Sequence, residues 1–384
     1  MTSNSTTAFF LSLAVVLAAA RVIGILCRRI HQPPVVGEIL AGVALGAIPF
    51  VREEFPGQQQ ALLAAVAAVG LAAFMFVMGF ELDFAELWRR RGRPITIALG
   101  SVGIPLIAGA LLALPLAGRH GPGSSAVFVA FVAVAMSVTA LPVLARILAD
   151  TGLDGTDSGR LAFAVAAVGD AAAWIALAAV AAGAGAAAGS HGWRMAFLLV
   201  YLVVLVFVIR PLLRRMMAAP DGETRSWHDA SATLPVIALL LAMSCAATEW
   251  MGLHFAFGAF AFGVAFPRAG LVREPQAVTG QFSAVADLLM PIYFVLAGYS
   301  VVLQSIDGTA ALILIAVLFV AIASKTGGGY LGARLAGIDH GEARTIAILC
   351  SIPAASPRSS SSPSDCNSRS STRRSTPSCW SWRW

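Results

Sequence analysis

The stretch AVAAVGDAAAWIALAAV, residues 164–180, contains one acid, Asp170, among apolar and glycine residues. The apolar run continues on both sides, from about Leu161 to Ala187. A helix needs about 20 apolar residues to cross the ~30 Å hydrocarbon core of a bilayer, so Asp170 is predicted near the middle of a membrane-spanning helix. Ionisable residues at that depth are costly to insert, and they commonly mark ion or proton sites.

The composition extends this prediction to the whole chain. Of the 384 residues, 58% are hydrophobic and 12% are charged, whereas soluble domains have roughly 25% charged residues. The apolar residues do not alternate as in strands, which indicates an all-α polytopic membrane protein. A twelfth apolar segment begins near 343 but ends before it is long enough to span the membrane. Eleven complete spans are expected before it, at about 8–27, 33–50, 59–80, 94–117, 124–149, 158–187, 193–216, 232–251, 253–268, 280–304 and 308–333.

The charges give an orientation and exclude a nucleic-acid partner. Arginines, Arg146 and Arg160 after span five among them, are concentrated after the odd-numbered spans. The positive-inside rule therefore places the N-terminus outside and the odd-numbered loops in the cytoplasm. The net charge of +6 includes +4 from the last 33 residues, and no basic patch remains in the body. The expected surroundings are a lipid bilayer.

Two pairs of spans resemble each other at the same offset. VGEILAGVALG (36–46) resembles AFGAFAFGVAF (256–266), and FMFVMGF (74–80) resembles YFVLAGY (293–299). The offset is seven spans, an odd number, so the two copies have opposite orientations in the membrane. Inverted repeats of this kind are typical of secondary transporters. Chance similarity between helices rich in Gly and Ala is the alternative.

Two further spans carry polar residues. In AMSVTALPVLARILAD (135–150), Ser137, Thr139 and Pro142 interrupt the apolar run, which indicates either a simple proline kink or a helix break whose ends coordinate an ion. Lys325, in IASKTGGGYLGARLAG (322–337), is the single lysine of the chain. It is expected to pair with Asp170 or to extend toward the membrane interface.

Glu38 is a further candidate residue, and the sequence contains no enzyme motif. Glu38 follows Pro33 and Pro34 by a few residues, and it faces either a water-filled funnel or the cytoplasmic headgroups. The chain has no Ser/His/Asp cluster, no HExxH motif and no Walker loop, so neither an enzyme, nor a cofactor, nor a metal site is predicted. The cysteines have no metal-ligand spacing.

Together these residues resemble the monovalent cation:proton antiporter-2 family of the sodium/hydrogen exchanger superfamily. The resemblance covers residues 8–350, in the family's order, through the stretches QPPVVGEILAGVALG (32–46), FMFVMGFELDF (74–84), MSVTALPVLARILAD (136–150), AAVGDAAAW (166–174), LHFAFGAFAFGVAFPR (253–268), LLMPIYFVLAGYS (288–300) and SKTGGGYLGARLAG (324–337).

The resemblance implies a homodimeric antiporter in a bacterial inner membrane, with an ion-carrying core domain and a second domain at the dimer interface. Asp170 is expected to bind a proton or a monovalent cation, Na⁺ or K⁺, in competition. Many relatives have a polar residue before this acid, whereas this chain has Gly169, which favours one-for-one exchange. The alternatives are a proton-coupled exporter of a small organic cation and a membrane sensor or scaffold that does not transport.

The C-terminal segment departs from the family. The resemblance predicts a motif like Asn-Thr-Arg-Gly-Leu-Thr-Glu and a broken helix, but residues 352–384 are rich in Ser and Arg. A disordered tail is one interpretation. When each codon's third base is joined to the next two bases, residues 352–358 can encode Thr-Arg-Gly-Leu-Thr-Glu, and 364–368 can encode Gly-Leu-Gln-Leu. We therefore expect an incomplete transmembrane domain at 1–351 and a frameshifted tail at 352–384.

Overall fold

The computed structural model describes residues 3–54, 57–82, 93–120, 125–139, 141–153, 155–183, 192–217, 227–267, 275–301 and 308–351. Within these ranges the chain forms helices and short turns, without a strand, which confirms the predicted all-α class. Helices suit a lipid environment because they satisfy their backbone hydrogen bonds internally. The tail expected at 352–384 lies outside the described residues.

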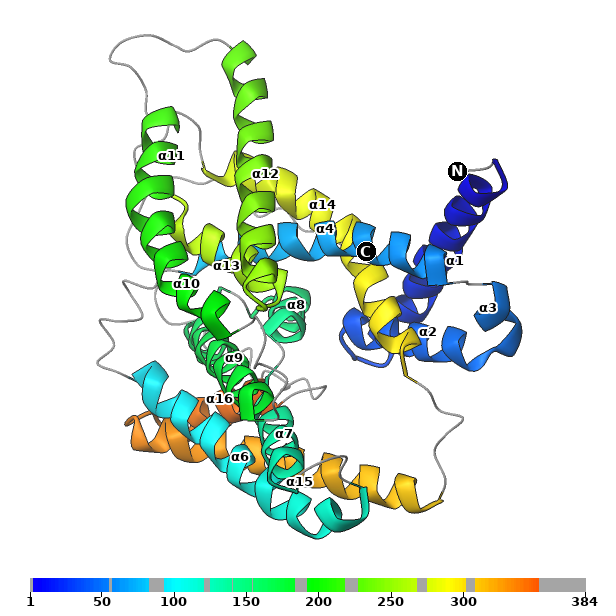
Figure 1. Cartoon of the computed structure of the whole chain (residues 1–384), viewed down its shortest axis with the longest axis vertical. Coiled ribbons are helices and arrows are strands. Elements are labelled where there is room, and N and C mark those ends of the chain that lie inside the picture. The colour runs from blue at the N-terminus through cyan, green and yellow to red at the C-terminus, as the bar shows by residue number, and fades with distance from the viewer. Residues whose placement is uncertain are drawn as a thin grey trace, which may run out of the picture.

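The expected spans correspond to the observed helices, and span five is interrupted as its sequence indicates (Figure 1). A π-helical turn, η1 (Leu205–Ile209), joins two of the helices. The α-helices are α1 (Ser3–Arg29), α2 (Pro34–Ala47), α3 (Pro49–Glu54), α4 (Gly57–Glu81), α6 (Arg93–His120), α7 (Ser125–Ser137), α8 (Leu141–Thr151), α9 (Asp157–Gly183), α10 (Gly192–Val204), α11 (Arg210–Met217), α12 (Trp227–Trp250), α13 (Phe255–Ala265), α14 (Pro275–Tyr299), α15 (Gly308–Leu335) and α16 (His340–Ser351).

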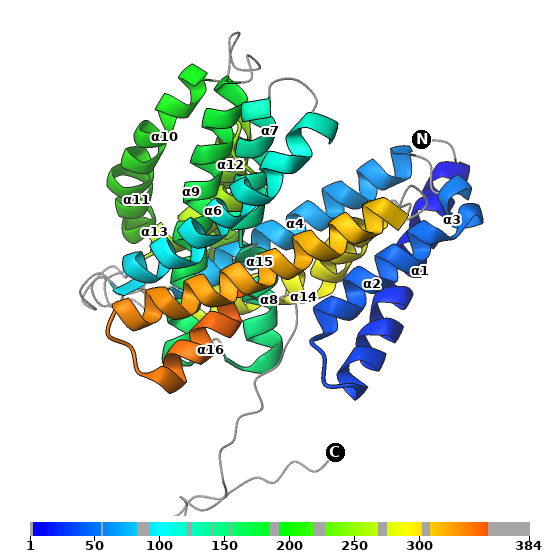
Figure 2. The same cartoon turned by 90° about the horizontal axis from the view of Figure 1, so that it is seen from below.

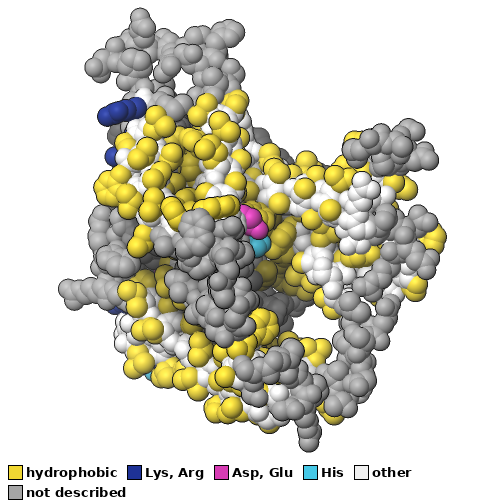
Figure 3. Space-filling model, viewed as in Figure 1, with side chains coloured by type: hydrophobic (Ala, Val, Ile, Leu, Met, Phe, Trp, Pro, Cys, Tyr) yellow, Lys and Arg dark blue, Asp and Glu magenta, His cyan; other side chains and the backbone are white. Residues whose placement is uncertain are grey.

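The outer surface of these helices is suited to lipid. Seven stretches of the described chain are long and apolar enough to cross a membrane, and three shorter apolar helices accompany them. The remaining expected span, 158–187, corresponds to α9. Figure 3 shows hydrophobic side chains over much of one face of the molecule. Large apolar side chains such as Leu199 and Phe319 are exposed there or elsewhere on the helices, as expected for residues that face lipid.

Two groups of helices pack together as bundles (Figures 1 and 2). Bundle 1 consists of α1, α2, α4, α13 and α14, in which α4 packs against α13 and α14, and α2 packs against α1 and α14. Bundle 2 consists of α6, α7, α8, α9, α15 and α16, in which α6 packs against α15, α7 and α9. Helix α8 reaches across to α2 and α4, so it joins bundle 2 to bundle 1.

Close backbone contacts between α2 and α14 depend on two glycines. A Cβ atom on Gly42 would collide with the carbonyl oxygen of Val295, and one on Gly298 would collide with that of Ile39. Helices in membranes associate through small residues that let their backbones approach. The two glycines therefore allow α2 and α14 to pack closely.

Helices α4 and α13 repeat this arrangement. A Cβ on Gly263 would collide with the carbonyl oxygen of Phe76, and one on Gly79 would collide with that of Phe260. Under the predicted repeat, α13 corresponds to α2 and α14 corresponds to α4. Gly263 then matches Gly42, and Gly79 matches Gly298. In both pairs, the carbonyl that each glycine approaches belongs to the residue three positions before the glycine of the partner helix. The two helix pairs support the predicted inverted repeat.

The close contact of α2 with α14 predicts an effect on stability. Gly42→Ala should lower the free energy of unfolding by about 1–3 kcal/mol, because the two backbones must move apart to accept a methyl group. Gly280→Ala, on the partner helix α14 but with open space around it, is the matched control. It should be neutral or stabilising by up to about 1 kcal/mol. Thermal unfolding in detergent compares the two variants, and equal melting temperatures would contradict the close approach.

Candidate functional site

The interrupted span five places two helix ends inside the protein. Helix α7 ends at Ser137 and α8 begins at Leu141. Pro142 lies in the first turn of α8, where proline is tolerated. In a continuous helix the carbonyl of Val138 would accept a hydrogen bond from the N–H of residue 142, but proline has none. The break therefore leaves the Val138 carbonyl and the Leu141 N–H free for other partners.

Lys325 of α15 occupies the α7 side of the break. Its ammonium donates to the carbonyl oxygen of Val138, and its Nζ lies 3.4 Å from Thr139 Oγ1. The C-terminal end of a helix carries partial negative charge on its unpaired carbonyls, which attracts a cation. The lysine charge thus compensates the negative end of α7.

Asp170 of α9 occupies the α8 side of the break. Its half-buried carboxylate accepts a hydrogen bond from the backbone N–H of Leu141, the first residue of α8. The N-terminal end of a helix carries partial positive charge and unpaired N–H groups, which favour an anion. Asp170 and Lys325 are therefore held at opposite poles of one interrupted helix.

The expected pairing of Asp170 with Lys325 takes an indirect form. The two groups interact electrostatically, but among the described contacts each makes its hydrogen bonds to the break rather than to the other. The Asp170 carboxylate is consequently not closed off by a direct ion pair. Gly169, which precedes it, contributes no side-chain ligand and faces Val102.

Thr139 and Ser137 differ in what they contact. Thr139 Oγ1 lies 3.5 Å from the carbonyl oxygen of Cys350, at the last turn of α16. Helix α16 therefore ends beside the break in span five. Ser137 is buried and donates its hydroxyl to the carbonyl of Val134 in its own helix, at 2.8 Å. Neither hydroxyl has Asp170 among its described hydrogen-bond partners, so their expected role as ion ligands stays a prediction.

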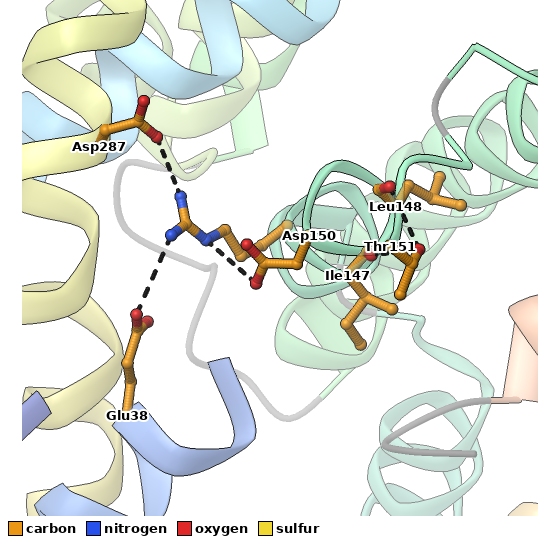
Figure 4. A network of polar contacts seen from close by, with 7 residues as sticks. Glu38, Ile147, Leu148, Asp150, Thr151 and Asp287 are labelled. Carbon is orange, nitrogen blue, oxygen red and sulfur yellow. Dashed lines mark hydrogen bonds and ion pairs between the residues drawn. The ribbon is translucent and has the colours of Figure 1, made fainter. Parts of the chain in front are cut away.

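Glu38 lies in a different cluster, centred on Arg146 of α8 (Figure 4). The cluster also contains Asp150 of α8 and Asp287 of α14. In the sequence Arg146 counts among the basic residues that set the orientation, yet its side chain is only 11% exposed. The i, i+4 spacing of Arg146 and Asp150 was the available signal for an ion pair, whereas their approach to Glu38 and Asp287 depends on tertiary packing.

A cavity of about 260 Å³ lies between the bundles, where α4, α8 and α9 meet. Leu148, Arg160 and Phe163 from bundle 2 and Met78 and Glu81 from bundle 1 are among its lining residues. Glu38 is absent from this lining, so its expected position in a water-filled funnel stays a prediction. Among the described residues, no three His, Cys, Asp or Glu side chains are grouped so as to hold a metal ion.

These features define a membrane transporter core built on an interrupted helix with an acid at its centre. The chain belongs to the sodium/hydrogen exchanger family, because the model of that family's transmembrane domain matches residues 14–355. It is an integral, multi-pass membrane protein of a family of secondary transporters. The resemblance drawn from the sequence is confirmed.

Curated relatives with similar sequences are antiporters by name. Cation/H(+) antiporter 17 of Arabidopsis thaliana is 34% identical over 354 residues, which cover 89% of this chain and 41% of that protein. Na(+)/H(+) antiporter NhaS4 of Synechocystis sp. is 31% identical over 370 residues, which cover 91% of this chain and 87% of that protein. The chain spans about two fifths of the length of the plant relatives it matches.

Solved structures share the fold. The sodium proton antiporter MjNhaP1 from Methanocaldococcus jannaschii superposes with a TM-score of 0.65, covering 90% of this chain and 81% of that protein. The two sequences are 13% identical, so the likeness concerns the fold alone. It confirms the predicted inverted-repeat antiporter bundle with discontinuous helices.

The contacts of Lys325 predict a stability effect. Lys325→Met keeps an unbranched side chain but leaves the Val138 carbonyl without its donor, which should lower the free energy of unfolding by about 1–3 kcal/mol. Thr326→Ala is the matched control, because among the described residues the Thr326 hydroxyl bonds the carbonyl of Ile322 in its own helix. Its expected effect is within about 0.5 kcal/mol. Thermal unfolding in detergent measures both, and equal losses would contradict a special role for the ammonium.

Proposed function

We propose that this protein exchanges a monovalent cation, Na⁺ or K⁺, for protons by alternating access, with Asp170 binding either ligand in turn. The observation that carries the proposal is the Asp170 carboxylate at the positive end of α8, inside a membrane protein and without a direct ion pair among the described residues. The names of the relatives, Na(+)/H(+) and K(+)/H(+) antiporters among them, support the choice of ligands.

The coupling follows from the single charge at this position. A buried carboxylate is stabilised when a cation or a proton neutralises it, and one small site holds only one of the two at a time. The Leu141 N–H keeps the carboxylate oriented toward the break. Because Gly169 adds no second acid, one proton is exchanged for one cation per cycle.

We infer that Lys325 compensates the charge of Asp170 when the site holds neither a proton nor a cation. When Asp170 holds neither ligand, the lysine charge and the positive end of α8 together compensate the carboxylate. A lysine is suited to this because its ammonium is a compact charge on a flexible chain, and here it remains anchored to α7. It therefore stabilises the intermediate between release of one ligand and binding of the other.

Alternating access requires the site to move relative to a fixed frame. Asp170, Lys325 and the break all belong to bundle 2, whereas bundle 1 contributes none of them. We infer that bundle 2 carries the ion and that bundle 1 forms the interface of a homodimer. Two-fold dimers are the commonest oligomers, and the exposed apolar face of α1 suits such an interface.

We place the protein in a bacterial inner membrane with the N-terminus outside. The support for the orientation is the alternation of arginine-rich and arginine-poor loops. In this orientation the C-terminal end of α8 and the N-terminal end of α2 face the cytoplasm, because both adjoin arginine-rich loops.

Asp170→Asn should abolish exchange. The amide can still accept the Leu141 N–H, so the fold should persist, but it cannot release a proton or carry the compensating charge. In proteoliposomes of the frame-restored protein with an imposed pH gradient, Na⁺, K⁺ and small organic cations are added in turn and internal pH is followed. Asp339→Asn, which changes an exposed acid that caps α16, is the control. We expect Na⁺ or K⁺ to dissipate the gradient with the control and not with Asp170→Asn.

Other outcomes of this assay would identify another function. A response to organic cations alone would indicate an exporter of such compounds. No response to any cation, from protein that binds none of them, would indicate a sensor or scaffold. Full exchange by Asp170→Asn would contradict the assignment of the site.

We further propose that residues 1–351 are an incomplete transmembrane domain and that 352–384 are translated in a shifted frame. The support is the second reading frame, together with the end of α16 beside the break. Sequencing the gene from codon 340 onward should reveal an inserted or deleted base near codon 352. Restoring the frame gives the protein on which the proteoliposome assay is run. An unshifted gene whose product exchanges ions would refute this proposal.

A further inference from the structure

One arginine joins three carboxylates across the boundary between the bundles (Figure 4). The Arg146 guanidinium, on α8 of bundle 2, lies 3.5 Å from Asp150 through Nε and 3.3 Å from Asp287 of α14 through Nη1. Its Nη2 lies 4.0 Å from Glu38 Oε1 on α2. Two of these three acids belong to bundle 1. We call these four residues the Arg146 network.

A second polar contact crosses the same boundary. Neither Pro33 nor Pro34 has an N–H, so Val35 provides the first backbone donor at the start of α2, and the helix has no side-chain cap of its own. The Asp150 carboxylate of α8 accepts this N–H. An acid from bundle 2 therefore serves as the cap of a helix in bundle 1, where the helix dipole favours it.

Helix α8 connects the Arg146 network to the candidate ion site. Its first residue, Leu141, donates to Asp170, and Arg146 follows five residues later, about 7.5 Å along the helix axis. A change in the position of α8 when Asp170 gains or loses a ligand must therefore move Arg146 and Asp150. Both contact bundle 1, so the boundary responds to the site.

The composition of the network suits a contact that opens and closes. One guanidinium faces three carboxylates, and among the described residues the buried Glu38 Oε2 has no hydrogen-bond partner. Buried ion pairs add little net stability compared with apolar packing, and their best-attested use is to select between arrangements. Asp287, with its side chain 74% exposed, gives water access to one arm of the network.

We propose that the Arg146 network holds the two bundles together on the cytoplasmic side of Asp170, and that it opens whenever the site is exposed to the cytoplasm. This inference deepens the proposed exchange function and rests on it, because only an alternating mechanism needs such a contact to break. Arg146 is a positioning residue here: it acts through α8 and does not touch the ion.

Hydrogen exchange of the full chain in detergent tests the proposal without measuring transport. In Arg146→Gln, backbone amides of α8 and of the first turns of α2 should exchange about tenfold faster than in the unmodified chain, within the usual range for a coupling between sites. Glu342→Gln is the matched control, because among the described contacts that acid bonds Ser158 of α9, within bundle 2. It should leave exchange in α2 and α8 unchanged.

Two further variants separate a specific ion contact from general destabilisation. The charge-swapped double variant, Arg146→Glu with Glu38→Arg, should slow backbone hydrogen exchange in α2 back toward the rate of the unmodified chain. Asp287→Asn, which removes only the exposed arm, should give a smaller increase, about threefold, and it tests the proposal if Arg146→Gln does not fold. Faster hydrogen exchange throughout the protein in all variants would overturn the proposal. Unchanged hydrogen exchange in Arg146→Gln would also overturn it.

The response to ligand distinguishes this inference from the function on which it rests. Saturating Na⁺ or K⁺ should change the rate of backbone hydrogen exchange in α2 and α8 of the unmodified chain. This change should be lost in Arg146→Gln. Changes confined to the surroundings of Asp170 would overturn the role of the network and leave the exchange function intact. Selective loosening by Arg146→Gln in a chain that does not transport would support the network and overturn the exchange function.

Discussion

The interrupted helix of span five is the constraint on which the rest of the structure depends. Pro142 removes one backbone donor, and the break frees a carbonyl on one side and an N–H on the other. Lys325 and Asp170 satisfy those groups from two different helices. In lipid, a free backbone group has no water to bind, so the break persists only because these charges meet it. The same arrangement leaves an acid available to a ligand.

The inverted repeat supplies the frame around this break. Glycines at matching positions bring α2 against α14 and α4 against α13, and the two contacts involve corresponding residues. Bundle 1 thereby gains a tightly packed set of helices, while bundle 2 holds Asp170 and Lys325. At their boundary lie α8 of bundle 2, a cavity and the Arg146 network. A boundary with polar contacts and a cavity is easier to rearrange than one closed by continuous backbone contact.

Much of this arrangement could be predicted from residue patterns. The helical class, the position of Asp170 within a span, the repeat and the break all follow from local signals, because span length, apolar content and glycine spacing are properties of short segments. The indirect arrangement of Asp170 and Lys325 was less predictable. Depth in the membrane brings the two groups near each other, but it does not reveal that the break offers each of them a closer backbone partner.

By itself the sequence determined that this is a helical membrane protein of the sodium/hydrogen exchanger family, since hydropathy, motif order and the arginine distribution are written along the chain. Tertiary structure alone decided that Arg146, counted among the basic residues that set the orientation, is a buried bridge between Glu38 and Asp287. The reason is physical: a side chain's partners come from helices distant in sequence. Only the packing of α2, α8 and α14 brings those three charges within reach of one another.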